Sequence, residues 1–184
     1  CLDGIGVYTA LCTDLREFVI FNRLTQYFTE LDSIDLNPLA NCQNLERLEI
    51  SFLYLKNIDL TPLENCRNLK VVNLAVNRLT TIDLTPLAKC ENLKELHLRT
   101  NGLETIDLTP LEKHKSLEVL NLMENSLKTI NLTPLKNCEN LKELLLWWNQ
   151  LTTIDLTPLE NCKKLRRLSL GRNSFTNSTC EHIC

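Results

Sequence analysis

Apolar and polar positions recur along this chain with a period of 24 residues. The six prolines mark the period, because they stand at equivalent places in successive copies: Pro38, Pro62, Pro86, Pro110, Pro134 and Pro158. One copy runs from the segment Ile-Asp-Leu-Thr-Pro-Leu at 82–87 through the spaced leucines of 93–103. A fixed period of this length is typical of a solenoid, in which each copy packs only on its neighbours.

Each copy contains a short segment in which apolar and polar residues alternate. The segment Leu-Lys-Glu-Leu-His-Leu at 93–98 is an example, and the alternation predicts a strand with one buried face. An asparagine follows each such segment at Asn77, Asn101, Asn125, Asn149 and Asn173. A buried asparagine can satisfy backbone groups of its own copy and of an adjacent one, so we expect a column of hydrogen-bonded asparagines.

A Thr-Pro pair marks the return path of the copies. Threonine is a good helix N-cap, and proline is favoured at the first helical position. A glutamate completes a capping box in three copies, at Glu64, Glu112 and Glu160. The pattern predicts a helix of one or two turns, because the next strand begins about eight residues after the proline.

The spacing Leu-x-x-Leu-x-Leu-x-x-Asn-x-Leu-x-x-Ile begins at Leu69, Leu93, Leu117, Leu141 and Leu165. A sixth copy starts at Leu45, with Leu53 at the asparagine position, and a degenerate copy fits from Phe21. Over roughly residues 21–177 the chain therefore resembles the leucine-rich repeat proteins. The resemblance implies an α/β solenoid: a right-handed superhelix with a parallel sheet on the concave face and short helices on the convex face. The usual activity of that family is protein recognition on the concave face.

The period divides the chain into three parts. We expect an N-terminal cap with a degenerate first repeat over 1–33, and a helix over 9–20 within it. About six repeats then fill 34–177, and 178–184 form a short C-terminal cap or a truncated end. Because the chain begins with Cys1 and not with methionine, we interpret it as a piece of a longer polypeptide, and further domains of that polypeptide are among its expected partners.

Five of the nine cysteines occupy one equivalent site, as Cys42, Cys66, Cys90, Cys138 and Cys162. A free cysteine packs as a small apolar side chain, so the pattern favours a column of core thiols and a reducing, cytoplasmic setting. The alternative is a secreted or cell-surface protein. It rests on terminal cysteines at 1, 12, 180 and 184 and on two glycosylation sequons, at 131–133 and 177–179.

The residues between the strand leucines differ most from copy to copy, and we expect them on the concave face. Both tryptophans of the chain, Trp147 and Trp148, fall there, near Leu145 and Met123. Exposed aromatic residues are enriched at binding hot spots. We predict a docking site for a protein or peptide partner, with a charged rim at His97, Arg99, Glu124, Arg167 and Arg172. The alternative is one tryptophan packed on a neighbouring loop and one incidental surface aromatic.

Two weaker sites are also considered. An apolar patch comprises Phe52, Leu53 and Tyr54, with Val71 and Val76; part of it is expected to pack on the N-terminal cap. His114 replaces cysteine in the core column, but without a local Cys-x-x-Cys pair we interpret it as a core histidine and not as a zinc ligand.

Other chemistry is disfavoured. Cys180, His182 and Cys184 form a weak metal or disulfide candidate, and the aspartates before Thr-Pro are expected to make turn hydrogen bonds and not to hold calcium. No nucleophile accompanies His97, and no glycine-rich phosphate loop exists, so we predict no enzyme activity and no cofactor. A formal net charge of -3 without basic runs disfavours nucleic acid, and no apolar run is long enough to span a membrane.

The sequence thus predicts a non-catalytic protein-interaction module. Two alternatives stay open. The first is a structural or substrate-receptor segment of a larger multidomain enzyme or signalling protein. The second is a secreted recognition ectodomain.

Overall fold

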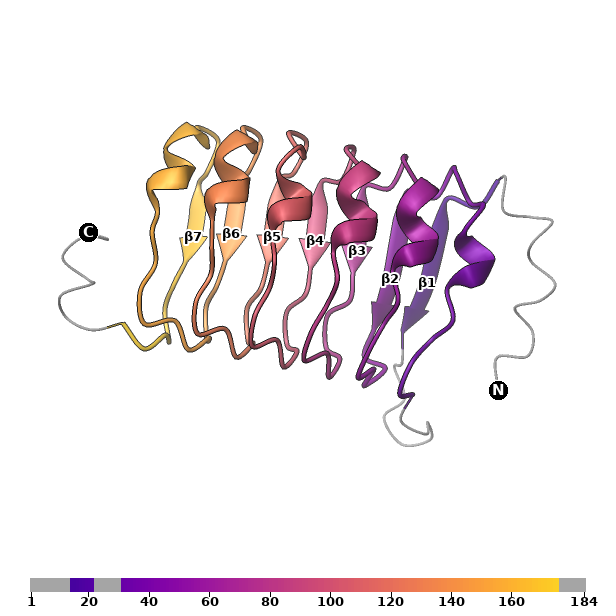
Figure 1. Cartoon of the computed structure of the whole chain (residues 1–184), viewed down its shortest axis with the longest axis horizontal. Helices are drawn as coiled ribbons and strands as arrows, with labels where there is room; N and C mark the ends of the chain where they lie inside the picture. Colours follow the sequence, from indigo (N-terminus) through magenta and orange to yellow (C-terminus); the bar gives the residue numbers. More distant parts are fainter. Residues whose placement is uncertain (1–13, 22–30, 176–184) are drawn as a thin grey trace.

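The computed structural model describes residues 14–21 and 31–175, which form a solenoid with a row of strands on one side and a row of short 3-10 helices on the other (Figure 1). Seven parallel strands form one sheet in the order of the chain. They are β1 (Glu17–Phe21), β2 (Arg47–Ser51), β3 (Val71–Asn73), β4 (Glu95–His97), β5 (Val119–Asn121), β6 (Glu143–Leu145) and β7 (Arg167–Ser169). The predicted solenoid is confirmed.

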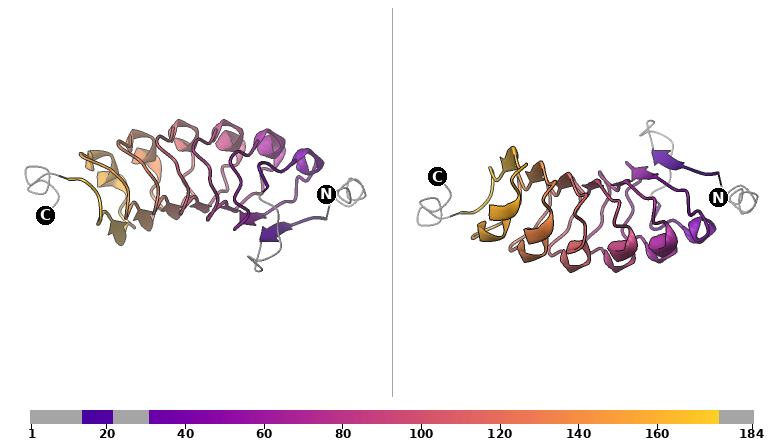
Figure 2. Two further views of the ribbon diagram at one scale, coloured as in Figure 1. Left: turned by 90° about the horizontal axis from the view of Figure 1, so that it is seen from below. Right: turned by 90° about the horizontal axis from the view of Figure 1, so that it is seen from above.

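Within the described residues, six 3-10 helices form the second row. They are η2 (Asn37–Leu39), η3 (Thr61–Asn65), η4 (Thr85–Lys89), η5 (Thr109–Leu111), η6 (Thr133–Asn137) and η7 (Thr157–Asn161). Figure 2 shows both rows following a shallow arc, with the strands on its inner side. From β2 to β7 the register advances by the sequence period, since Arg47 pairs with Val71 and Glu143 with Arg167.

Stacked leucines fill the space between the two rows. In the coil that contains β4, the following side chains are at most 1% exposed: Leu93, Leu96, Leu98, Leu103, Leu108 and Leu111. This burial supplies the main stabilisation, because each coil removes the apolar surface of its neighbours from water. At the end of the sheet Leu168 is 37% exposed, although its register partner Leu144 is fully buried.

The asparagines form the predicted column. The Nδ2 group of Asn101 donates to the carbonyl oxygens of Leu98 and Leu74, each at 3.1 Å, and Oδ1 accepts from the amide of Leu79 at 3.1 Å. Asn125 makes the same contacts one coil later. Each side chain therefore ties two coils together.

The return path differs from the prediction in its capping. A leucine, and not the threonine, is the N-cap of each helix: Leu60 precedes η3, whose first residues are Thr61 and Pro62. The aspartate two residues before the threonine supplies the hydrogen bond, since Asp59 Oδ1 accepts from the Thr61 amide at 2.9 Å. The predicted capping box is also wrong, because Glu64 pairs with Lys89 of the next coil.

The first coil departs from the predicted cap. Residues 17–20, assigned above to a helix, belong to β1, while 9–13 lie outside the described residues. β1 pairs with β2 at an offset of 30 residues, since Glu17 aligns with Arg47, so the copy proposed from Phe21 is also misplaced. The run Glu-Phe-Val-Ile-Phe favours a strand because aromatic and β-branched residues fit a pleated surface. Phe18 and Ile20 pack against the core.

After each strand from β2 to β7 the backbone passes through the left-handed region. The residues with positive φ at this position are Phe52, Val76, Thr100, Glu124, Trp148 and Arg172, with φ between 54° and 61°. The turn lets the Val76 amide donate to Arg99 O at 2.9 Å, and the Asn77 amide donate to Thr100 O at 3.2 Å. Non-glycine residues pay about 1–2 kcal/mol for this conformation, which the coil-to-coil hydrogen bonds offset.

Candidate functional site

The strand face is the surface formed by the outward side chains of β2–β7 and by the second and third residues after β3–β7. Each coil places its outward residues beside those of the next, because the register advances by one repeat. Variation between copies is therefore displayed as columns on one surface. Trp147 and Trp148 occupy adjacent columns just after β6.

The two tryptophans and an arginine form one cluster. The indole rings of Trp147 and Trp148 meet edge to face, with centroids 5.3 Å apart and planes at 90°. The Arg172 guanidinium carbon lies 5.2 Å from each ring centroid, within the range of a cation–π contact. Trp148 is 52% exposed, whereas Trp147 is half-buried.

A glycine in the next coil makes room for Trp147. A Cβ atom on Gly171 would lie 3.0 Å from Trp147 Cδ1 and 3.3 Å from Nε1, closer than ordinary packing permits. The indole therefore rests on the backbone of the following coil. We call Trp147, Trp148, Gly171 and Arg172 the tryptophan site.

The other two apolar residues of the predicted site, Leu145 and Met123, are more buried than Trp148. Leu145 is only 5% exposed, so it is a buried support and not a contact surface. Its prediction as part of the exposed patch is wrong, because a strand-face position beside large side chains can be covered by them. Met123 is half-buried in the column of Trp147.

The residues of the predicted charged rim lie in three coils, those of β4, β5 and β7, and most of them make local pairs. His97 Nε2 lies 3.0 Å from Glu95 Oε2, and Arg167 Nη1 lies 3.5 Å from Glu143 Oε2. The Thr100 hydroxyl donates to Glu124 at 3.1 Å. Arg99 is exposed. The structure brings only Arg172 into contact with the tryptophan rings.

Sequence reasoning missed two features of this site. Arg172 was expected at the rim, but it contacts both rings. Gly171 was not singled out, although a glycine one repeat after a tryptophan in the same column is a signal that the sequence contains.

The second apolar patch is exposed at two of its residues. Phe52 is 44% and Tyr54 36% exposed, while Leu53 is 6% exposed. The Arg78 guanidinium lies 4.9 Å from the Tyr54 ring centroid.

Comparison with protein families now adds to this geometry. The family model for the BspA type Leucine rich repeat region matches in six copies, over residues 4–142 and 56–180. The chain belongs to the BspA-type leucine-rich repeat family. Comparison with curated proteins finds no match.

Solved structures share this fold. Internalin F of Listeria monocytogenes is 26% identical with a TM-score of 0.69, covering 92% of this chain and 46% of the internalin. Internalin C2 of the same organism is 29% identical with a TM-score of 0.63, covering 78% and 59%. The ectodomain of the Arabidopsis thaliana receptor kinase GASSHO1/SCHENGEN3, solved with CASPARIAN STRIP INTEGRITY FACTOR 2, is 26% identical with a TM-score of 0.76, covering 89% and 19%. This chain therefore spans less than two thirds of each of these proteins.

The cysteine column of this BspA-type array has a polar role as well as an apolar one. Cys66, Cys90, Cys138 and Cys162 are free and buried. Each thiol points a weak donor at a leucine carbonyl of the preceding coil, as in Cys162 Sγ to Leu135 O at 3.5 Å. Burial raises the pKa of the Cys90 thiol to about 12, so this thiol stays protonated at neutral pH. Cys42 differs from the predicted free thiol, because it is disulfide-bonded.

His114 takes the place of a cysteine in this column. Its side chain is fully buried, and Nε2 lies 3.1 Å from Leu87 O, the carbonyl equivalent to those that the thiols contact. Nδ1 has no hydrogen-bond partner. Burial lowers the pKa of His114, because desolvation disfavours the charged ring. Among the described residues no three potential metal ligands come together, and Cys180, His182 and Cys184 lie outside them.

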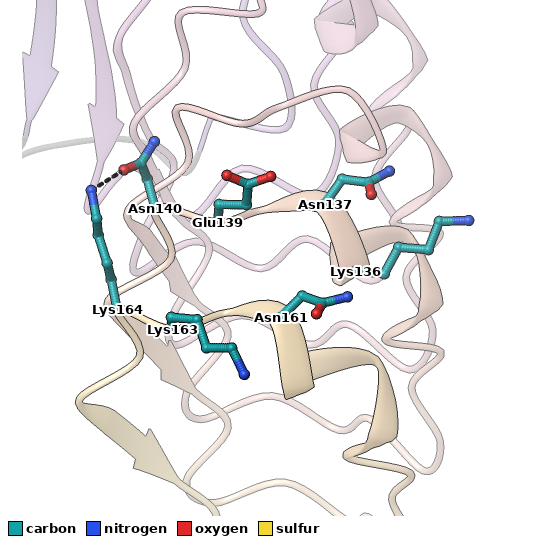
Figure 3. A pocket seen from close by; sticks show the side chains of 7 residues that line it. All are labelled: Lys136, Asn137, Glu139, Asn140, Asn161, Lys163 and Lys164. Atoms are coloured by element: carbon teal, nitrogen blue, oxygen red, sulfur yellow. Dashed lines mark hydrogen bonds between the residues drawn. The ribbon is translucent and has the colours of Figure 1, made fainter.

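Three grooves lie away from the strand face, on loops that flank the 3-10 helices. One of about 370 Å³ runs between the coils of η6 and η7, lined by Lys136, Asn137, Glu139, Asn140, Asn161, Lys163 and Lys164 (Figure 3). Lys164 Nζ donates to Asn140 Oδ1 at 2.6 Å across it. Within residues 14–21 and 31–175, no helix has the length and apolar character needed to cross a membrane.

Proposed function

We propose that this chain is a non-catalytic module that binds a protein or peptide partner on its strand face, with the tryptophan site as the hot spot. The observation that carries the proposal is the exposure of Trp148 beside Trp147 and Arg172 on a surface whose core leucines are buried. Aromatic residues and arginine are the residues most enriched at binding hot spots. No folding requirement explains an indole that is half exposed to water.

The family supports the same conclusion. Leucine-rich repeat arrays are interaction modules, and the GASSHO1/SCHENGEN3 ectodomain was solved in complex with CASPARIAN STRIP INTEGRITY FACTOR 2. In this proposal Trp147, Trp148 and Met123 supply apolar contact area. His97, Arg99, Glu124 and Arg167 set the orientation of the partner from the neighbouring coils; Arg99 and Arg167 are exposed, and His97 and Glu124 are half-buried.

A capture experiment tests the proposal. The native chain and a Trp147→Ala/Trp148→Ala variant are used to capture proteins from an extract of the source organism. A Phe52→Ala/Tyr54→Ala variant is the matched control, because it removes two other exposed aromatic side chains. We expect a protein retained by the native chain and by the control but lost with the tryptophan variant. Equal retention by all three folded proteins would refute the proposed hot spot.

A second proposal concerns the cellular compartment of the module. We infer a secreted or surface setting in preference to the cytoplasmic one predicted from the cysteine column. Disulfides persist in oxidising compartments, and Cys42 is disulfide-bonded. The test is a thiol count on the natively produced protein, denatured without reductant. Fewer than nine free thiols are expected, and all nine free would restore the cytoplasmic prediction.

A further inference from the structure

The guanidinium of Arg172 is held by two aromatic rings and not by a carboxylate. Two other arginines of the strand face have acidic partners: Arg47 lies 2.8 Å from Glu49, and Arg167 lies 3.5 Å from Glu143. Arg172 has ring contacts at 5.2 Å on both indoles and no ion pair among the described residues. Its charge is therefore positioned but not neutralised.

The two indoles leave part of the hydrogen-bonding edge of Arg172 available. Their planes stand at 90°, so the planar guanidinium can lie parallel to at most one ring. Its five N–H donors lie in its own plane, and those that point away from the rings stay free to bind a partner. A carboxylate matches that edge in a bidentate pair, and such charge-assisted pairs are about twice as strong as neutral hydrogen bonds. The two indoles also fix the guanidinium before binding, which lowers the ordering cost on association.

The charge of the surrounding coils has the sign that an acidic partner needs. Residues 133–175 carry seven Lys or Arg and four Asp or Glu, whereas residues 31–132 carry eleven and fourteen. The coils of the tryptophan site are thus net positive within a chain that is net negative. Three of the seven basic residues, Lys136, Lys163 and Lys164, line the groove between η6 and η7, so the positive excess belongs to these coils as a whole and not to the strand face alone. A positive region of this kind raises the association rate of an acidic partner and disfavours a basic one.

We propose that Arg172 binds a side-chain carboxylate of an acidic segment of the partner protein, while the indoles of Trp147 and Trp148 contact an apolar residue next to that carboxylate. This inference rests on the proposed function, because it names the partner chemistry of the same site. A protein carboxylate fits better than a nucleic-acid backbone. A phosphate chain needs basic residues along an extended track, and residues 31–132 taken together are net negative.

The fluorescence of the protein reports directly on this site, because the chain has only two tryptophans and both belong to it. Two peptides without aromatic residues are titrated: acetyl-Glu-Glu-Leu-Glu-Glu-amide and its counterpart with glutamine at each glutamate. We expect a saturable change in tryptophan emission with the acidic peptide, and an affinity about tenfold lower for the glutamine peptide. The affinity for the acidic peptide should fall as NaCl is added.

Substitutions at Arg172 and at Lys113 distinguish binding by the Arg172 guanidinium from a general effect of positive charge. Arg172→Gln should lower the affinity for the acidic peptide about tenfold, and Arg172→Lys should restore only part of it, since an ammonium lacks the planar fork. Lys113→Gln, which removes an exposed charge from the side of the 3-10 helices, should leave the affinity unchanged. A heparin titration serves as the polyanion comparison, and binding that is tighter than for the acidic peptide and insensitive to Arg172→Gln would contradict the inference.

The two proposals can fail separately. Equal affinity for the acidic and glutamine peptides would overturn the carboxylate inference and leave the tryptophan hot spot standing. The same holds for an unchanged affinity in Arg172→Gln. No emission change with either peptide would overturn the carboxylate inference, while the capture experiment with the double tryptophan variant decides the hot spot on its own.

Discussion

The indole of Trp147 lies on the backbone of Gly171 in the next coil, so closely that a Cβ atom there would stand 3.0 Å from Cδ1. Gly171 has no positive φ, so its value at this position is space and not backbone freedom. The contact explains how a coil-to-coil surface can accept a tryptophan. It also makes the site depend on a residue without a side chain.

Gly171→Val should therefore displace Trp147 without unfolding the array. We expect a changed near-ultraviolet circular dichroism signal from the indoles and loss of partner binding, with an unfolding free energy within about 1 kcal/mol of native. Gly102→Ala is the control, because its Cβ would meet Leu79 O at an ordinary 3.5 Å. An unchanged tryptophan signal in Gly171→Val would contradict the packing described here.

Substitutions of Leu144 and Trp148 should affect different properties: the first the free energy of unfolding, the second partner binding. Leu144 is fully buried, and Leu144→Ala removes core volume, so we expect a loss of about 2–5 kcal/mol in urea unfolding. Trp148 is 52% exposed, and Trp148→Ala should cost less than about 1 kcal/mol while partner binding falls. Equal destabilisation by the two substitutions would show that Trp148 is a structural residue.

The asparagine column should behave as a structural element even though its members are polar. Asn125→Leu leaves the carbonyls of Leu98 and Leu122 and the amide of Leu103 without the side-chain partners that they now have. An unsatisfied buried group costs about 1–3 kcal/mol, so a loss of about 2 kcal/mol or more is expected by denaturant unfolding. Leu53 occupies the equivalent place in an earlier coil, and Leu53→Asn should be tolerated far better. A neutral Asn125→Leu would contradict the hydrogen-bond account.

Position 76 offers a stabilising change. Val76 has a φ of 57°, which is costly for a β-branched residue, and asparagine adopts this conformation more readily. Val76→Asn should raise the unfolding free energy by about 1 kcal/mol, measured by thermal or urea unfolding. Val72→Asn, at a fully buried position of β3, should lower it strongly. A destabilised Val76→Asn would mean that the apolar contacts of Val76 outweigh its backbone strain.

His114 should make the free energy of unfolding fall as the pH drops below the unfolded pKa of histidine. Its folded pKa is lowered from 6.5 by burial, so the unfolded chain binds the proton first as the pH falls. Stability is therefore complete above about pH 6.5 and declines below it. Of the nearby charged groups, Glu91 acts in the opposite direction. Hydrogen bonds from their threonines lower the pKa of Asp83 and Asp107, so those carboxyls affect stability only at more acidic pH.

The comparison of urea midpoints at pH 7.5 and 5.5 tests this effect. The native chain should lose more stability between these values than His114→Cys, which restores the thiol found in neighbouring coils. A parallel pH response of the two proteins would contradict the assignment of this dependence to His114.

Much of this architecture could be predicted from the chain alone. The leucine spacing fixes the strand register from β2 onward, and the asparagine column follows from one polar residue in an apolar pattern. The aspartates were expected to make turn hydrogen bonds, and Asp59 does so with Thr61. These features are local or repeat at a constant interval, which a single sequence displays directly.

The predictions that proved wrong concern contacts that the spacing of the repeat does not reveal. β1 lies 30 residues before β2, so a reading at the 24-residue period misplaced it. Thr61 was predicted to be the N-cap of a helix that begins at Pro62. In the structure the helix begins at Thr61, and the Thr61 amide donates to the Asp59 carboxylate. Leu145 looked exposed from its strand position, yet it is 5% exposed. The cation–π contacts of Arg172 with both indoles depend on how side chains of two coils meet, which the spacing of the repeat does not show.

The central claim is that a partner docks on the strand face at the tryptophan site. The most direct test places a photoreactive phenylalanine analogue at position 123, in the column of Trp147, and in a second protein at position 113, on the side of the 3-10 helices. The account predicts that illumination in an extract of the source organism crosslinks a protein from position 123 and not from position 113. A crosslink formed only from position 113 would contradict it.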